Sequence, residues 1–219
     1  MAGALTEVRR PPAPPLVLAS SSPRRKEVLE TIGFQFDVVA AAPGTEQPWR
    51  RGQDPVAFAE QTACAKRDQV AVTRPDALVM AADTVVMLDD DVLEKPVDAD
   101  DARAMLFKLA GRDHVVCTGV AVVGPSGAPV SGTEKTGVHF RDLDIEEIAD
   151  YVATGEPLDK AGAYGIQGLG SALVRRVDGC YFNVMGLPVS RLLDLLAEVG
   201  WEYRAPGLLR PVGAPTRSH

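Results

Sequence analysis

The sequence predicts an α/β protein built on a mixed β-sheet, and three observations lead to that fold class. Short apolar runs such as 16–18 and 77–88 alternate with segments of helical periodicity, as the crossover units of a sheet require. Two apolar segments flank the turn sequence PSGA (125–128), which predicts a β-hairpin and therefore antiparallel pairing in the same sheet. At 219 residues, 46% of them hydrophobic, the chain is long enough to bury a sizeable core.

Local signals place each element in order. A strand at 16–20 leads into a helix for which Ser22 is the expected N-cap, Pro23 the first residue and Gly33 the stop. Asp54 and Pro55 open a second helix that runs to about residue 70. The further elements expected are a strand at 77–88, a turn at 89–91, helices at 98–110, 144–154 and 188–199, the hairpin strands around PSGA, and a pair of strands around 177–179.

The two ends of the chain lack such patterns. Residues 1–15 are proline-rich toward their end and are expected to form a mobile arm, and residues 206–219 a flexible tail. Between them we expect a single domain over 16–205. No internal repeat is evident.

Composition excludes several classes of protein. A net charge of −7 argues against general nucleic-acid binding, which requires a basic surface. No apolar run is long enough to cross a bilayer, and no signal region precedes the first strand, so we expect a cytoplasmic protein without membrane contact. The three cysteines form no CxxC pair, which favours reduced thiols over a disulfide framework or a zinc site.

Three cations occupy the first turn of the first helix, where the helix dipole is positive. Arg24, Arg25 and Lys26 should each cost about 0.3–1 kcal/mol there unless an anion joins them. The alternative is a solvated basic turn. Because small residues and the hydroxyls of Ser20, Ser21 and Ser22 precede the helix, we favour a phosphate-binding site.

A single carboxylate, Asp83, lies within the apolar strand 77–88 beside Thr84. Burying it is costly unless it meets a metal ion, a cation or hydrogen-bond donors. It could cap a nearby backbone turn, but with a phosphate site suspected we favour a metal ligand or general base. Lys66, Lys95 and Glu46 carry little weight alone and would matter only if they converge on this site.

The segment 161–170 is dense in glycine and contains Gln167. It could be a flexible connector. Glycines also allow backbone to approach a flat ring, and a glutamine amide offers both a donor and an acceptor to the edge of a nucleobase.

Three stretches together resemble the Maf family of nucleoside triphosphate pyrophosphatases. They are LASSSPRRKEVLETIGFQFDVV, AADTVVMLDDDVLEKP and EPLDKAGAYGIQGLGSALVRRVDGCYFNVMGLP, in the family's order and spanning most of the chain from 16 to about 199. The resemblance implies an elongated fold shared with the inosine triphosphate pyrophosphatases, with two lobes, a central cleft and commonly a homodimer. It also implies that water attacks the α-phosphorus of a nucleoside triphosphate, giving the monophosphate and pyrophosphate, with Mg²⁺ or Mn²⁺ as cofactor.

The resemblance also assigns roles to individual residues. Asp83 matches the catalytic acid, and Glu46 matches a further metal-binding carboxylate. Positions linked to specificity fall on Arg24, Thr84 and Gln167, and basic positions for the phosphate chain fall on Arg25, Lys66 and Lys95.

The sequences EKP and LDKAGAYGIQG resemble the branch of the family that acts on dTTP and UTP, and both these nucleotides and modified pyrimidine nucleotides stay open as substrates. Three alternatives remain open from the sequence. The first is the same reaction on 7-methyl-GTP or another modified nucleotide, and the second is a nucleotide-binding regulator of cell division without turnover. The third is a protein that binds a sugar phosphate or a mononucleotide without preferring the triphosphate.

Overall fold

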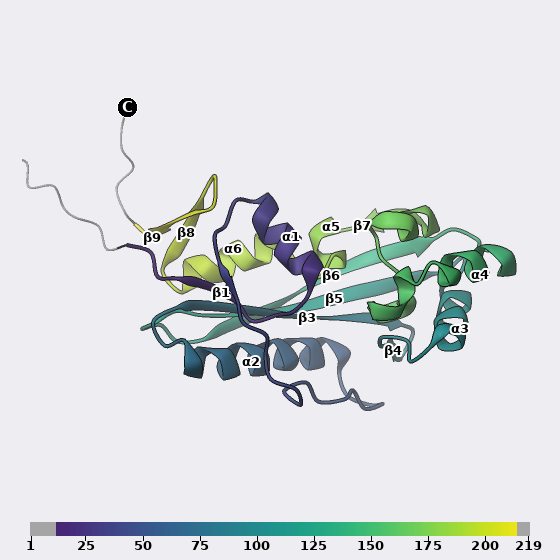
Figure 1. Ribbon diagram of the computed structural model, residues 1–219, viewed down its shortest axis with the longest axis horizontal. Helices are drawn as coiled ribbons and strands as arrows, with labels where there is room; N and C mark the ends of the chain where they lie inside the picture. Colours follow the sequence, from purple (N-terminus) through teal and green to yellow (C-terminus); the bar gives the residue numbers. More distant parts are fainter. Residues whose placement is uncertain (1–11, 214–219) are drawn as a thin grey trace, which may run out of the picture.

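In the computed structural model, which describes residues 12–213, the predicted α/β fold is confirmed as a seven-stranded mixed sheet with helices on both faces (Figure 1). Its strands are β1 (Leu16–Leu18), β2 (Asp37–Val38), β3 (Leu78–Leu88), β4 (Asp91–Leu93), β5 (Asp113–Val123), β6 (Val130–Phe140) and β7 (Val174–Asp178). The main helices are α1 (Pro23–Thr31), α2 (Pro55–Thr73), α3 (Ala99–Leu109), α4 (Ile145–Ala153) and α6 (Val189–Glu198).

The order of the strands leaves an opening at one edge of β3. The sheet runs β2-β1-β3-β5-β6-β7, with the first three strands parallel and the hairpin β5–β6 antiparallel, as PSGA predicts. On the edge away from β5, β3 pairs with β1 through Leu78–Met80 and with β4 through Val86–Leu88. Residues 81–85 therefore have no strand beside them on that edge.

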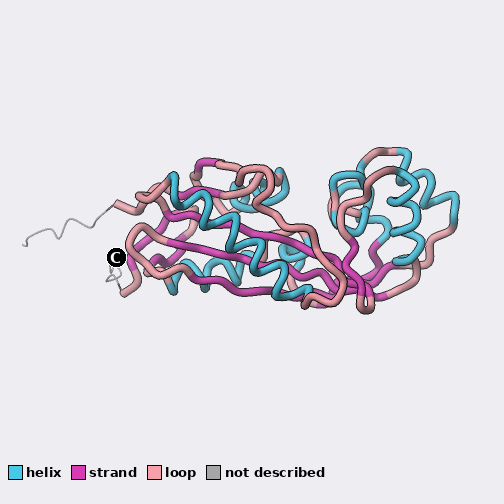
Figure 2. The backbone as a smooth tube through the Cα atoms, turned by 90° about the horizontal axis from the view of Figure 1, so that it is seen from below, coloured by secondary structure: helices cyan, strands magenta, loops and turns pink. Residues whose placement is uncertain are grey.

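Four hydrophobic clusters are present in the described residues, and the two largest divide the molecule along its length. One gathers β1, α1 and α6 around residues such as Leu18, Leu29 and Leu192. The other gathers α3, α4 and the far end of the sheet around residues such as Leu106 and Phe140. The helices form two groups along the long strands (Figure 2), which agrees with the predicted two lobes.

Helix α2 lies on the opposite face of the sheet from α1 and α6 (Figure 1). It begins as expected, because the side chain of Asp54 accepts a hydrogen bond from the backbone N–H of Val56. The close approach of α2 to β5 requires a glycine at position 119, since a Cβ there would lie 2.5 Å from the carbonyl oxygen of Ala59. This contact sets how closely α2 packs on the sheet and thereby positions its side chains.

The prediction of two strands around 177–179 is correct for the first strand and wrong for the second. β7 ends at Asp178, and Gly179 turns the chain with φ +127° into the short helix α5 (Tyr181–Val184). The fully buried Asn183 donates to the carbonyl of Val116 and to the hydroxyl of Thr136, which holds this segment against the sheet as a helix.

The flexible tail expected from residue 206 is also not what the structure shows in its described part, 206–213. It contains β9 (Leu208–Pro211), which pairs with β8 (Trp201–Arg204) in a separate two-stranded sheet. Tyr203 of β8 donates to the carbonyl of Ile32 and packs edge-on against Phe34, so the hairpin rests on the end of α1. Of the predicted arm, residues 1–11 lie outside the described residues, as do 214–219 of the tail.

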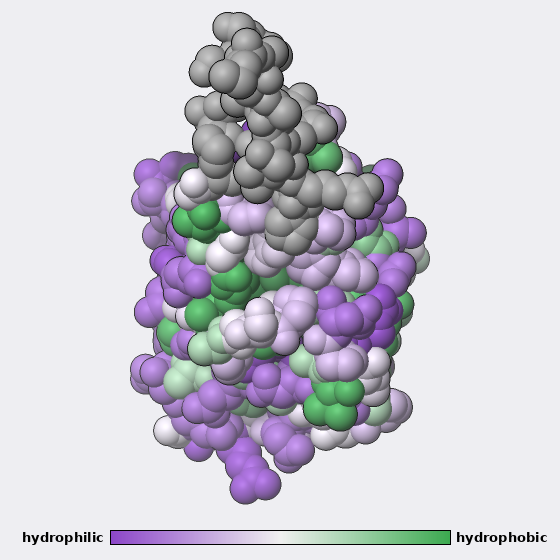
Figure 3. Space-filling view, turned by 90° about the vertical axis from the view of Figure 1, so that its left-hand side faces the viewer, coloured by the Kyte–Doolittle hydropathy of each residue, from purple (hydrophilic) through white to green (hydrophobic). Residues whose placement is uncertain are grey.

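Figure 3 views the end of the molecule at which β8 and β9 lie, where hydrophobic residues form separate groups among hydrophilic ones. Across residues 12–213, none of the helices has the length and apolar character that crossing a membrane demands.

Candidate functional site

A cleft of about 560 Å³ opens beside the unpaired stretch of β3. The structure brings together in its lining the residues that the sequence analysis expected at the site, except one of the three cations of the first helix. The lining includes Ser20, Arg24, Arg25, Glu46, Lys66, Asp83, Thr84, Lys95 and Gln167. They come from the β1–α1 turn, the first turn of α1, the loop before α2, α2 itself, β3, the segment after β4 and the glycine-rich segment. Lys26 lies outside the lining and pairs with Glu30 at 3.6 Å.

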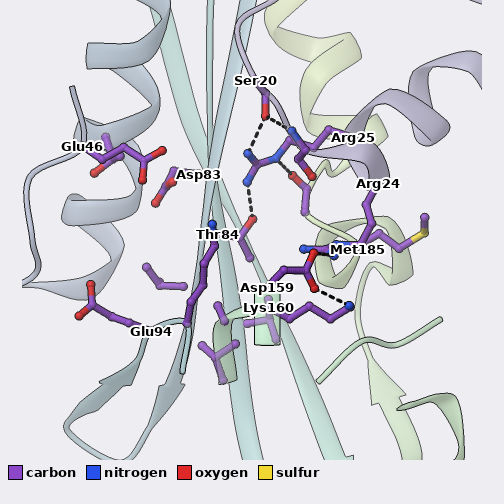
Figure 4. A pocket seen from close by; sticks show the side chains of 18 of the residues that line it. Ser20, Arg24, Arg25, Glu46, Asp83, Thr84, Glu94, Asp159, Lys160 and Met185 are labelled. Carbon is purple, nitrogen blue, oxygen red and sulfur yellow. Dashed lines mark hydrogen bonds and ion pairs between the residues drawn. The ribbon is translucent and has the colours of Figure 1, made fainter. Parts of the chain in front are cut away.

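Asp83 and Thr84 are neighbours on β3 and point to opposite faces of the sheet. Asp83 is opposite Gly119 of β5, the position that contacts α2, whereas Thr84 is opposite Thr118. Because no strand covers this edge of β3, both side chains reach the same cleft (Figure 4). The acid and the arginines are therefore close together, although they come from different sides of the sheet.

Arg25 is buried and its guanidinium is held by three neutral oxygens. Nε donates to the carbonyl of Gly186 at 2.8 Å, and the two terminal nitrogens donate to Ser20 Oγ and Thr84 Oγ1, each at 3.1 Å. Burial lowers the pKa of Arg25, and the charge of Asp83 opposes that effect. Guanidinium stays charged in proteins, so the cleft contains a cation with no carboxylate among these hydrogen-bond partners.

The hydrogen bonds also fix which way two hydroxyls point. Thr118 donates to the carbonyl of Asn183, so the 3.0 Å contact between Thr84 and Thr118 must use the proton of Thr84. Thr84 then presents only lone pairs to the cleft. Ser20 accepts from both Arg25 and the backbone N–H of Ser22, and its own proton remains available to a ligand.

The first turn of α1 faces the cleft without a side-chain cap. Ser22 has the extended backbone of an N-cap, as predicted, but its hydroxyl caps no N–H of the helix. Free backbone donors at a helix N-terminus attract anions. Together with Arg24 and Arg25, they make this side of the cleft a suitable place for phosphate oxygens.

Two residues of the cleft were missed by the sequence analysis. Asp159 accepts from Arg24 at 3.3 Å and from Lys160 at 2.6 Å, on the side of the cleft opposite Glu46 (Figure 4). Partial burial alone would raise the pKa of Asp159. The hydrogen bond and charge of Lys160, followed by those of Arg24, outweigh this effect and hold that pKa below its ordinary value. The only signal in the sequence was the position of Asp159 and Lys160 directly before the glycine-rich segment.

Lys66 bridges the two carboxylates on the other side of the cleft. Its side chain is 7% exposed, and Nζ lies 2.7 Å from Oδ1 of Asp83 and 2.6 Å from Oε1 of Glu46. Partial burial would raise the pKa of Glu46, but the hydrogen bond and charge of Lys66 outweigh it and lower that pKa. The charges of Lys95 and Arg25 lower the pKa of Glu46 further. The three cations that the resemblance assigned to the phosphate chain therefore lie near these acids.

The donor set fits a divalent cation that is shared with a phosphate chain. Asp83 and Glu46 each use one oxygen for Lys66, and their other oxygens are of the hard type that Mg²⁺ and Mn²⁺ prefer. Within residues 12–213, no group of three or more potential metal-ligating side chains is gathered in one place. Ligand oxygens would have to complete the coordination, as is usual for Mg²⁺ at phosphate sites.

The glycine-rich segment is folded over the cleft by Glu156. This carboxylate accepts from the hydroxyl of Tyr151 and from the backbone N–H groups of Leu169 and Gly170. Gly170 must be a glycine, because a Cβ there would lie 2.2 Å from the carbonyl oxygen of Gly165. The segment is thus an ordered wall that presents Gln167, and the alternative of a flexible connector is wrong.

Comparisons with known proteins agree over most of the chain. A family model described as Maf-like protein matches residues 15–199. A relative from Geobacillus sp. (strain WCH70), named dTTP/UTP pyrophosphatase, is 46% identical over 186 residues, which cover 85% of this chain and 98% of its own length. A relative of the same name from Nitratidesulfovibrio vulgaris is 48% identical over 188 residues, covering 86% and 89%. The solved structure of the Staphylococcus aureus Ham1 protein has a TM-score of 0.41 at 13% identity, covering 73% of this chain and 79% of that one, a likeness too low to add to this description.

Proposed function

We propose that this chain, which belongs to the Maf family, is a nucleoside triphosphate pyrophosphatase that hydrolyses dTTP and UTP to the monophosphate and pyrophosphate. The observation that carries the proposal is the arrangement around β3, where Lys66 holds Asp83 and Glu46 opposite the buried charge of Arg25. An acid, a potential metal site and cations thus converge on one cleft. The substrate follows from the relatives' names.

In this mechanism the cations receive the triphosphate. Arg24, Arg25, Lys66 and Lys95 offset the negative charge of the phosphates, which would otherwise repel a nucleophile. Ser20 donates its free proton to a phosphate oxygen, and the backbone N–H groups of the first α1 turn act in the same way. Held in this manner, the α-phosphorus faces the side of the cleft on which Asp83 lies.

Asp83 is the proposed general base. It takes a proton from a water molecule whose oxygen forms a bond to the α-phosphorus, while the bond from that phosphorus to the α–β bridging oxygen breaks and pyrophosphate leaves. A Mg²⁺ or Mn²⁺ ion held by Asp83 and Glu46 would supply charge stabilisation for the leaving pyrophosphate. Thr84 and Gln167 contact the nucleoside. The homodimer and the cytoplasmic location stay predictions.

A nucleotide panel in ¹⁸O-labelled water tests the proposal. We expect pyrophosphate release from dTTP and UTP with Mg²⁺ or Mn²⁺, none with EDTA, and ¹⁸O in the monophosphate only. Preference for 7-methyl-GTP would instead favour the alternative substrate. Label in pyrophosphate would contradict attack at the α-phosphorus, and no release from any triphosphate would favour a regulator without turnover.

A further inference from the structure

Gln167 makes one contact that decides how its amide is turned. Its Nε2 donates to Oε1 of Glu27 at 3.1 Å, although the two residues are 140 positions apart. Gln167 belongs to the wall over the cleft, and Glu27 lies on the exposed surface of α1. An ionised carboxylate can only accept hydrogen bonds, so the amide must turn its nitrogen toward Glu27.

This orientation determines which polar atom Gln167 offers elsewhere. The nitrogen and oxygen of a planar amide diverge, so the carbonyl oxygen points away from Glu27. Gln167 lines the cleft and Glu27 does not. The oxygen, which makes no other hydrogen bond within residues 12–213, is therefore the acceptor that Gln167 can offer to a ligand.

We propose that Glu27 is a positioning residue that holds Gln167 as a hydrogen-bond acceptor and thereby selects nucleobases with a ring N–H, an inference that rests on the proposed function. Uracil and thymine carry such a donor at N3, between two carbonyl groups. Cytosine has an unprotonated N3, which is itself an acceptor. An acceptor held in place by Glu27 thus pairs with uracil or thymine and opposes cytosine.

Without a carboxylate behind it, the amide has no fixed direction. The terminal torsion of a glutamine is broad and nearly two-fold, so exchanging the nitrogen and oxygen costs little. A turned amide would donate to N3 of cytosine. Loss of Glu27 should therefore change the choice of base more than it changes the hydrolysis step.

The experiment compares Glu27→Gln with Glu30→Gln, using kcat/KM for UTP and for CTP. Glu30 lies on the same helix and is exposed, but it pairs with Lys26 at 3.6 Å instead of with Gln167. Both variants lose one negative charge on α1. We expect the preference for UTP over CTP to fall about tenfold in Glu27→Gln, mainly through KM, and to stay at the wild-type ratio in Glu30→Gln.

A second comparison separates orientation from a general effect of charge. In a Gln167→Met background, where no amide remains to be turned, Glu27→Gln should leave the ratio unchanged. An unaltered ratio in the single variant Glu27→Gln, or an equal change with and without Gln167, would overturn the inference. Dissociation constants for UTP and CTP give the same ratio without turnover, so an inactive wild-type protein would count against the proposed function alone.

Discussion

The Nζ of Lys66 lies 2.7 Å from Oδ1 of Asp83, joining the middle of α2 to the middle of β3. The same ammonium reaches Glu46 on the loop before α2 at 2.6 Å. Two carboxylates this near a common point would repel each other, and the shared cation compensates for that repulsion. The arrangement places the Asp83 carboxylate against a cation at the edge of the cleft that also holds Arg25.

Asp83→Asn tests the role of the acid. Asparagine keeps the size of the side chain but cannot take up a proton from water, so we expect kcat for dTTP to fall by about 10²–10⁴. Binding of the unhydrolysed nucleotide, measured by equilibrium dialysis, should be largely preserved. Asp90→Asn, in the exposed β3–β4 turn, serves as the control and should keep wild-type turnover. Lost binding with normal residual turnover would contradict this role.

Replacing the two arginines of α1 by lysine should have different consequences. Lys in place of Arg25 cannot reach Ser20, Thr84 and Gly186 together, so buried acceptors lose their donors. We expect Arg25→Lys to lower the free energy of unfolding in urea by about 1–3 kcal/mol. The Arg24 side chain is 28% exposed and its contact with Asp159 is long, so Arg24→Lys should change stability by less than about 0.5 kcal/mol while raising KM.

Equal stability of the two variants would contradict the clamp described for Arg25. A KM unchanged in Arg24→Lys would show that this side chain does not contact the phosphates.

Gly170→Ala should disturb the wall of the cleft. The added Cβ would meet the carbonyl of Gly165 and the hydroxyl of Tyr151, so the backbone bonds to Glu156 must shift. We expect kcat/KM for UTP to fall by at least about tenfold, because a small displacement of Gln167 is enough to lose orientation. Gly127→Ala is the matched control, since its Cβ would only touch Val199 at 3.9 Å. Equal kinetics in the two variants would mean that the wall tolerates a side chain.

His114 should make stability depend on pH. Burial, followed by the charge of His139, lowers the pKa of His114 to about 4. Between its ordinary value near 6.5 and pH 4, the unfolded chain binds more protons than the folded one, so stability is full above this window and falls as the pH falls. From pH 7.5 to 5.0 we expect this residue to remove about 2 kcal/mol of the free energy of unfolding.

Urea unfolding of His114→Gln at the two pH values measures this contribution, and the variant should lose about 2 kcal/mol less than the wild type. Tyr164→Phe removes the hydroxyl that contacts Nε2 of His114 but leaves the imidazole in place, so it should retain the wild-type dependence. Identical pH dependence in His114→Gln and the wild type would contradict the assignment.

Much of the fold could be predicted because its signals are local. Caps at Asp54, Asp98 and Asp144 begin helices where expected, and the last of these forms a full capping box with Glu147. The second strand expected after Gly179 was wrong because the helix there depends on Asn183, whose partners are 47 and 67 positions away. Strand β9 was missed for a similar reason, since its hairpin rests on Ile32 and Phe34.

The same distinction between local and long-range signals applies to the residues of the site. Three cations in the wrong turn of a helix and one acid in an apolar strand are visible in the sequence, because each would be unfavourable without a partner. Asp159 and Lys160 were not visible, since polar residues beside a glycine-rich segment are ordinary at the surface. Neither was the role of Glu27, which depends on a hydrogen bond across 140 positions.

By itself, then, the sequence determined most of the elements, the residue types of the cleft and the family pattern, since propensities, caps and unfavourable charges act over a few positions. Only the tertiary structure decided that β3 lacks a partner strand at residues 81–85, so that side chains from both faces of the sheet meet in one cleft. That meeting is set by strand order and by the close packing of α2 on Gly119. Both depend on contacts between segments distant in the chain.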